Sequence, residues 1–348
     1  MGENVLTVRE CFSSMSGPTF NGRIPCGHWR AILATWRASS SANHHSGWQS
    51  CVRCCQWRPI SACRPLEHEL RASLLAIRLG ERLKLGVEER RELLYVTLLR
   101  WIGCTSHAHE LASLFGDDLA AWERAATIDF GRPRDVVVDI LRHAGSGRRA
   151  PARLRIVTAA LAGGHQLVEE WFRGSCEVAE WFAGQLGLGA GVQEALGHAF
   201  ERWDGRGPRR VAGDMIPLAT RIVSLAQDVS TFERLGGLDS AVDVARRRSG
   251  SAHDPDLVEA FCQSPDEFLS DVEGTSSWST ELAAEPLPVL VVPDDRLDAA
   301  LRAVGEFADL KTPFMVGHST GVADLAEAAA RHAGLPRADI VLVRRVGP

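Results

Sequence analysis

The chain has 348 residues, of which 45% are hydrophobic, which is enough for a core in one large or two modest domains. Its formal net charge of −5 argues against binding a nucleic acid polymer. No apolar run approaches the roughly 20 residues of a membrane helix, and no continuous apolar segment marks a secretory signal. We therefore expect a cytoplasmic protein without a membrane partner.

Residues 1–61 differ in composition from the rest of the chain. Ser, Arg, Cys and Trp dominate, and no helical or strand period persists. This composition favours a disordered segment, or one read from a wrong start or frame of a GC-rich gene. Two functional alternatives stay open, a cysteine-rich secreted module and a tetrahedral zinc site. The candidate zinc ligands are His44, His45, Cys51, Cys54, Cys55 and Cys63.

From Pro65 onward the apolar residues recur with helical spacing. The segment PLEHELRASLLAIRLGERLKL predicts an amphipathic helix, and Gly86 is expected to end it in a left-handed conformation. A second helix is predicted from Glu88 to Trp101, and it ends in the sequence LLRWIG. These two helices predict the beginning of a helical domain.

The next hundred residues predict further helices joined by short turns. A helix is expected to start at Gly116-Asp117-Asp118, because acidic residues favour a helix N-terminus. The basic turn 145–149 could meet a phosphate or simply join two helices, and a helix is predicted over 165–182. Four residues could act as metal ligands, or could be ordinary polar and buried side chains: Cys104, His107, His109 and Glu110.

The most informative stretch runs from His198 to Asp228. Three glycines free its backbone and two prolines stiffen it, after which Ile216–Ala226 returns to helical spacing. A loop of this kind between two core helices is more often a site than a spacer. The loop residues that we single out are Asp204, Gly205, Gly207 and Pro208.

The sequence ERWDGRGP followed by IPLATRIVSLAQD resembles the HD-GYP branch of the HD-domain metal-dependent phosphohydrolases. That family has a His-His-Glu triplet, an Asp-Gly-x-Gly-Tyr-Pro loop, and then a helix with Arg-Ile and a metal-binding Asp. The matching residues here are Glu201, Asp204, Gly205, Gly207, Pro208, Arg221 and Ile222. The resemblance implies an all-α, HD-domain-like helical bundle.

Several metal-ligand positions of the family hold other residues in this chain. Ala199 and Phe200 replace the paired histidines, Gln227 replaces the aspartate, and the loop tyrosine is missing. The family's His-Asp pair corresponds to Arg100-Trp101, a permanent cation and an indole without a usable lone pair.

We therefore expect the dinuclear site to be lost. A divalent metal (Fe, Mn or Zn) is expected only if the site functions, on the remaining candidates His68, His198, Glu201 and Asp228.

The C-terminal part predicts an incomplete helical repeat. Residues 263–294 are typical of a linker, with a short strand expected near 289–293, and a helix is predicted over 296–308. The stretch from His318 to Leu335 has the spacing of His68 to Leu85 and resembles the family's first-ligand helix. His253-Asp254 is interpreted as a helix start, with Asp254 as the N-cap. We predict four regions: 1–61, the degenerate domain 62–262, the linker 263–294, and the truncated start of a second HD domain at 295–348.

The residues favour a degenerate HD-GYP-like domain that does not catalyse a reaction. It would act as a regulatory, nucleotide-sensing or protein-interaction module, with a cyclic dinucleotide or a signalling protein as its partner. Arg206, Arg209 and Arg210 would then contact phosphate, since arginine recognises phosphate without a metal. The alternative is an active metal-dependent phosphodiesterase that cleaves a cyclic dinucleotide or another phosphoester. The oligomeric state is not predicted.

Overall fold

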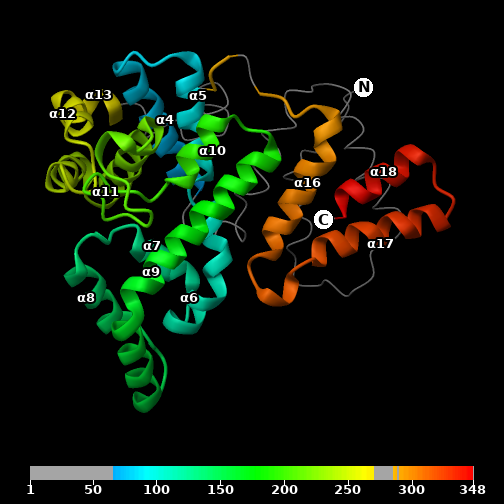
Figure 1. The fold of residues 1–348 in the computed structure, drawn as a ribbon, viewed down its shortest axis with the longest axis horizontal. Helices are drawn as coiled ribbons and strands as arrows, with labels where there is room; N and C mark the ends of the chain where they lie inside the picture. Colours follow the sequence, from blue (N-terminus) through cyan, green and yellow to red (C-terminus); the bar gives the residue numbers. More distant parts are fainter. Residues whose placement is uncertain (1–65, 270–284, 288–289, 348) are drawn as a thin grey trace, which may run out of the picture.

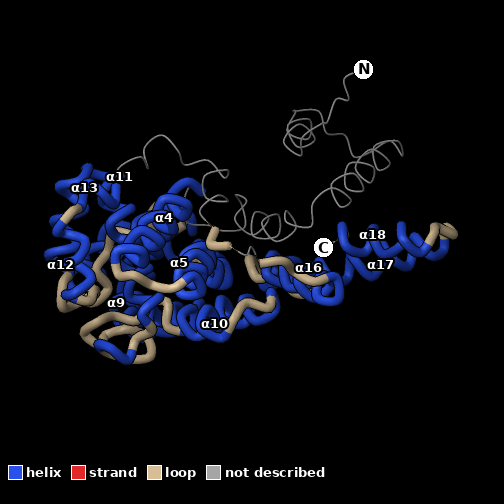
Figure 2. The backbone as a smooth tube through the Cα atoms, turned by 90° about the horizontal axis from the view of Figure 1, so that it is seen from above, coloured by secondary structure: helices blue, strands red, loops and turns tan. Residues whose placement is uncertain are grey.

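The computed structural model describes residues 66–269, 285–287 and 290–347. In this part of the chain all regular structure is helical, which confirms the all-α prediction, and Ser249 and His253 form only an isolated bridge. Figures 1 and 2 show a helical bundle with α16, α17 and α18 extending to one side of it. The predicted segment 1–61 and its alternative zinc site lie outside the described residues.

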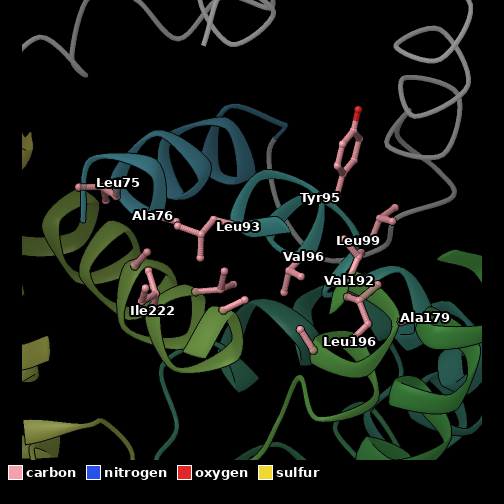
Figure 3. Packing of buried hydrophobic residues seen from close by; sticks show 14 of the residues in the cluster. Leu75, Ala76, Leu93, Tyr95, Val96, Leu99, Ala179, Val192, Leu196 and Ile222 are labelled. Carbon is pink, nitrogen blue, oxygen red and sulfur yellow. The ribbon is translucent and has the colours of Figure 1, made fainter. Parts of the chain in front are cut away.

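Four helices form the centre of the main core, and other helices also contribute buried side chains to it. The helices α4 (Leu66–Arg82) and α5 (Val87–Leu99) pack together, and both contact α11 (Leu218–Arg248), while α10 (Ala190–Gly197) closes the side next to α5. Figure 3 shows the aliphatic side chains of these helices meeting, among them Leu93, Val96, Leu196 and Ile222. Burying this apolar surface stabilises the bundle and fixes the position of α5 relative to α11.

The turn between α4 and α5 corrects one expectation. Gly86 is not a left-handed helix end, because its φ is −67° and it is the N-cap of α5. Lys84 instead takes the left-handed conformation, with φ of 59°. The chain turns earlier than predicted, since the amide of Leu85 donates to the carbonyl of Gly80. The carboxylate of Glu89 accepts from the amide of Gly86 at 2.6 Å and so caps α5.

A second group of helices surrounds the long helix α9 (Ala150–Leu186). It consists of η1 (Ile102–His107), α6 (Ala108–Phe115), α7 (Asp118–Ala125) and α8 (Pro133–His143). The predicted helix start is confirmed: Gly116 ends α6 with φ of 85°, and Asp117 accepts from the amide of Ala120. The helix predicted over 165–182 is part of α9, which continues N-terminally through Gly163 and Gly164.

The segment after the central loop returns to the core. The helix α11 is kinked at Gly236 and Gly237, and α12 (Pro255–Gln263) and α13 (Pro265–Leu269) follow it. Asp254 caps α12 by accepting from the amide of Asp256, as predicted. Residues 265–269 are therefore helical, although the sequence predicted a linker from 263.

The C-terminal part consists of α16 (Asp294–Asp309), η3 (Pro313–Met315), α17 (His318–His332) and α18 (Arg337–Val346). The described residues 290–293 do not form the expected strand. The helix α16 packs against α9, and the rings of Phe307 and Phe182 lie 5.5 Å apart in the main core. Among the described residues, no helix combines the length and the apolar character that crossing a membrane requires.

Candidate functional site

A cavity of about 720 Å³ lies between the end of α5, the connection from α7 to α8, the middle of α9, the loop after α10 and one face of α11. Its volume falls in the range of small-molecule sites. The glycine-rich loop singled out in the sequence contributes residues 200–202, 205–208 and 210 to its wall. The cavity is therefore the candidate site, and its chemistry depends on the side chains that line it.

Aromatic rings form one wall of the cavity. Phe200 lies 5.1 Å from Trp101 and 4.6 Å from Phe172, and Phe172 lies 4.9 Å from Phe130, all measured between ring centroids. These four rings come from four separate segments and all line the cavity. Such a wall offers flat apolar surfaces on which a planar ring of a ligand could stack.

Arg100 extends this aromatic wall with a cation. It follows the last residue of α5, where a positive charge is favourable beside the helix C-terminus. Its side chain is 7% exposed and lines the cavity. The guanidinium carbon lies 4.9 Å from the centroid of Phe200 and 5.8 Å from that of Trp101, within cation–π range.

The close packing behind Arg100 depends on a glycine. A Cβ atom on Gly103 would lie 1.9 Å from the carbonyl oxygen of Ser175, so only glycine lets η1 approach α9 here. Cys176, the next residue on α9, is completely buried. Burial raises the pKa of the Cys176 thiol to about 11, so it is uncharged near neutral pH.

Glu201 organises the backbone of the loop. One of its carboxylate oxygens accepts from the amide of Arg209 at 2.6 Å, and the other accepts from the amide of Val211 at 3.1 Å. Burial raises the pKa of Glu201, although these two backbone N–H groups lower it. Gly207 packs directly on this side chain, because a Cβ there would lie 2.4 Å from a carboxylate oxygen of Glu201. Glu201, which matches the family's glutamate, thus stabilises the backbone conformation of the loop.

A second set of contacts fixes the start of the loop. Arg202 donates to Asp129 at 2.7 Å and to both carboxylate oxygens of Asp204. Asp204 also accepts from the amide of Arg206, while Gly205 adopts a φ of +71°. A Cβ on Gly131 would collide with the guanidinium of Arg202, so this glycine makes room for the ion pairs.

The candidate metal ligand Asp228 is engaged by Arg248 and His253. Its carboxylate accepts from Arg248 and, at 2.7 Å, from Nε2 of His253. Burial alone would raise the pKa of Asp228, but the charge of Arg248 and the hydrogen bond with His253 outweigh burial and lower it. Asp228 is therefore ionised at neutral pH, and its charge is already balanced inside the protein.

The four candidate metal ligands do not form one cluster. His68 is buried, and its Nε2 lies 3.1 Å from the side-chain oxygen of Gln227. Nδ1 of His198 bonds the carbonyl of Glu194, and neither His68 nor His198 lines the cavity, whereas Glu201 and Asp228 do. Across the described residues, no group of three or more His, Cys, Asp or Glu side chains is arranged to hold a metal ion.

The donor set at the cavity therefore does not fit a divalent metal. The positions that correspond to the family's ligands hold a guanidinium, an indole, a methyl group, a phenyl ring and an amide, from Arg100, Trp101, Ala199, Phe200 and Gln227. Two of the possible replacement ligands near η1 pack against apolar or aromatic side chains. Cys104 is buried in an apolar cluster, and the ring of His107 lies 6.3 Å from that of Trp171.

The three predicted phosphate-binding arginines are distributed unevenly. Arg206 and Arg210 line the cavity, whereas Arg209 does not and instead pairs with Glu180 at 3.4 Å. Arg206 is exposed, and its guanidinium donates one long bond of 3.4 Å to the carbonyl of Gly131. Arg210 pairs with Glu169 on α9 at 3.2 Å and has a left-handed φ of 58°.

Sequence reasoning missed part of the site. It treated Arg100 only as an obstacle to metal, and it did not include Arg202, Asp129, Phe130 or Phe172, which line the same cavity. The cavity joins segments far apart in the chain, and Asp129 lies 73 positions before its partner Arg202. The glycine-containing turn 129–131 was the available signal for these cavity residues in the sequence. The residues that contact this turn, however, are brought to it only by the tertiary fold.

Comparison with known proteins relates the chain to phosphodiesterases. No model of a known protein family matches it. Over 288 residues it is 29% identical to the 3'3'-cGAMP-specific phosphodiesterase 3 of Vibrio cholerae serotype O1, a match that covers 81% of this chain and 62% of the relative. A crystal structure described as a cyclic GMP-AMP specific phosphodiesterase of V. cholerae superposes with a TM-score of 0.60 at 26% identity, covering 82% of this chain and 65% of that one.

The chain spans less than two thirds of the length of either protein. Both similarities are to proteins whose names describe phosphodiesterases specific for cyclic GMP-AMP.

Proposed function

We propose that this chain binds a cyclic dinucleotide in the cavity between α9 and α11, does not hydrolyse it, and serves as a regulatory or sensing module. The observation that carries the proposal is the make-up of the cavity, in which a wall of aromatic rings adjoins the arginines Arg100, Arg206 and Arg210. Aromatic faces stack on bases, and guanidinium groups bind phosphate without a metal. The 3'3'-cGAMP specificity of the V. cholerae relative supports this choice of ligand class.

The absence of hydrolysis is inferred from the chemistry of the lining residues. A dinuclear centre activates water because its carboxylate and imidazole ligands hold two cations together. Arg100 would repel cations at this spot, Glu201 is engaged with two backbone amides, and Asp228 is paired with Arg248. Binding of a ligand without a metal, at a degenerate site, is therefore the function that these residues support best.

Hydrolysis of a cyclic dinucleotide is the second candidate function. It is favoured by both comparisons: the 29% identity over 288 residues to a protein named as a phosphodiesterase, and the TM-score of 0.60 with a structure described as a cyclic GMP-AMP specific phosphodiesterase. On this view His68, His198, Glu201 and Asp228 would rearrange to hold Fe, Mn or Zn. We also infer that residues 295–348 correspond to the start of a second HD domain, which the repeated spacing after His318 supports.

One experiment separates these two functions. The purified chain is titrated with 3'3'-cGAMP by calorimetry, first with EDTA and then with added Mn²⁺ or Fe²⁺, and the ligand is afterwards examined by chromatography. We expect binding in EDTA and no linear product in any condition. Metal-dependent cleavage that is lost in His68→Ala would contradict the proposal and support the phosphodiesterase.

A pair of arginine variants locates the binding site. Arg206→Ala removes an exposed cation at the cavity and is expected to weaken binding by about tenfold, the usual effect of losing one charge-assisted contact. The control Arg234→Ala removes an exposed arginine of α11 that does not line the cavity, and it should leave the dissociation constant unchanged. Equal affinities of the two variants would place the ligand elsewhere.

A further inference from the structure

A continuous basic segment runs from the end of α8 through the following turn into the first turns of α9. Residues 140–168 contain five arginines and no aspartate or glutamate, in a chain whose formal net charge is −5. The turn 145–149, a candidate phosphate contact from its sequence, lies within this segment. Figure 1 shows that the first turns of α9 project beyond the other helices of the bundle. We call residues 141–161 the basic tip.

Most arginines of the basic tip have no partner in the part of the protein that the structure describes. Arg153 is the exception, because its guanidinium donates to the carbonyls of Leu141 at 3.1 Å and Arg142 at 3.3 Å, and so holds the end of α8 against α9. The side chains of the other four are exposed and form no hydrogen bond or ion pair with a described residue; they belong to Arg142, Arg148, Arg149 and Arg155.

The null explanation, that these arginines serve the stability of α9, does not hold. Positive charge near a helix N-terminus opposes the helix dipole, and Arg148, Arg149 and Arg155 all lie at that end of α9. No acidic residue of the first turn compensates for them. Their charge is therefore open to an anionic partner.

Exposed leucines accompany these arginines. Leu154 is 65% exposed and Leu161 is 43% exposed, and their spacing in the sequence places them on one face of α9. Leu141, at the end of α8, is 49% exposed. A nucleic acid or a soluble phosphate would contact the arginines and leave these leucines in water. A lipid surface, in contrast, takes leucine side chains into the acyl boundary while its anionic headgroups contact the arginines.

We propose that the basic tip binds the surface of a membrane that contains anionic phospholipids. Arg148, Arg149 and Arg155 contact phosphate groups, and Leu154 enters the boundary between headgroups and acyl chains. We expected no membrane partner because no apolar run of the sequence is long enough to span a bilayer, but a contact at the surface does not need such a run. The inference is independent of the proposed function, since neither Arg148 nor Arg149 lines the cavity.

Sedimentation with vesicles tests the role of the arginines. The purified full chain is expected to sediment with vesicles of phosphatidylcholine that contain about one third phosphatidylglycerol, and to stay in solution with pure phosphatidylcholine. Arg148→Ser/Arg149→Ser should lower the partition coefficient by about twentyfold, since each arginine near an anionic surface contributes about fivefold. Serine is a favourable N-cap, so the change at Arg149 keeps the start of α9. The matched control Arg234→Ser/Arg246→Ser removes the same charge from exposed positions of α11 and should partition as the wild type does.

A pair of leucine variants tests the insertion. Leu154→Ser should lower the partition coefficient by about fivefold, because its side chain no longer enters the membrane. The control Leu235→Ser, at a leucine of α11 that is 59% exposed, should leave it unchanged. Equal partitioning of the tip variants and their controls, or no binding of the wild type to anionic vesicles, would overturn the proposal. Arginine-dependent binding to polyglutamate without binding to vesicles would also overturn it, and would identify an acidic protein surface as the partner.

Discussion

At the scale of single residues, two substitutions change the character of the site. The resemblance in the loop implies an imidazole and an acid at positions 100 and 101, where Arg100 and Trp101 provide a cation and an indole that pack with Phe200. Glu201, which matches the family, is used to brace the loop through two backbone amides. The chemistry of the cavity therefore follows from the partners of each side chain, and identity at a motif position alone does not determine it.

The burial of His107 predicts that the stability of the fold decreases in acid. Burial lowers its pKa below the ordinary value of 6.5, although Glu110 and the backbone of Trp171 act in the opposite direction. Below about pH 6.5 the unfolded chain binds a proton that the folded chain resists, so stability present at neutral pH is lost as the pH falls.

We expect the free energy of unfolding in urea to decrease between pH 7.5 and 5.5, and to decrease less in His107→Gln. The same decrease in both proteins would show that His107 is not the cause.

At the scale of elements, the contact between η1 and α9 positions the aromatic wall. Gly103 allows this contact, because any side chain there would collide with the carbonyl oxygen of Ser175 at 1.9 Å. Backbone atoms of a long helix cannot move aside as a flexible side chain can. The helix η1, which begins two residues after Arg100, therefore lies close against α9 because Gly103 has no side chain.

Gly103→Ala is expected to destabilise the protein by about 3 kcal/mol, the upper part of the usual overpacking range, and to lower the melting temperature. The matched control is Gly163→Ala, since Gly163 is an exposed glycine inside α9, where a Cβ would meet no atom of another element within 4 Å. That change should stabilise by about 0.5–1 kcal/mol through helix propensity. Calorimetric unfolding of both variants checks the pair, and a neutral Gly103→Ala would contradict the close approach.

At the scale of the whole molecule, α16 ties the C-terminal helices to the bundle. Its residues Ala300, Ala303 and Phe307 belong to the same core as Phe182, although the sequence assigned α16 to a separate region. Figure 1 shows α16 beside α9, with α17 and α18 farther from the bundle. The first helix of this region is therefore expected to unfold together with the main core.

Phe307→Ala should reduce the free energy of unfolding of the whole protein by about 3–5 kcal/mol, because it empties a fully buried site. Phe314→Ala, at a side chain that is 88% exposed, should change it by less than about 0.5 kcal/mol. Circular dichroism during thermal unfolding measures both. If Phe307→Ala melted α16 to α18 alone in a separate early transition, the shared core would be refuted.

The order and type of the helices could be predicted from the sequence, because apolar spacing and capping are local properties. Asp117 and Asp254 were identified as helix starts in this way, and both accept hydrogen bonds from the first turn of their helices. The loop with Gly205 and Gly207 was recognised from its composition. The left-handed residue after α4 was not, since Lys84 takes that conformation against its intrinsic preference.

The cavity itself was decided only by the tertiary structure. Its wall joins Arg100, Phe130, Phe172 and Arg202, whose spacing in the chain carries no common period. Contacts between residues that are far apart in sequence determine which carboxylates pair with an arginine. They also determine which face of a helix lines the cavity. Local propensity determined the elements, whereas long-range packing determined what those elements could bind.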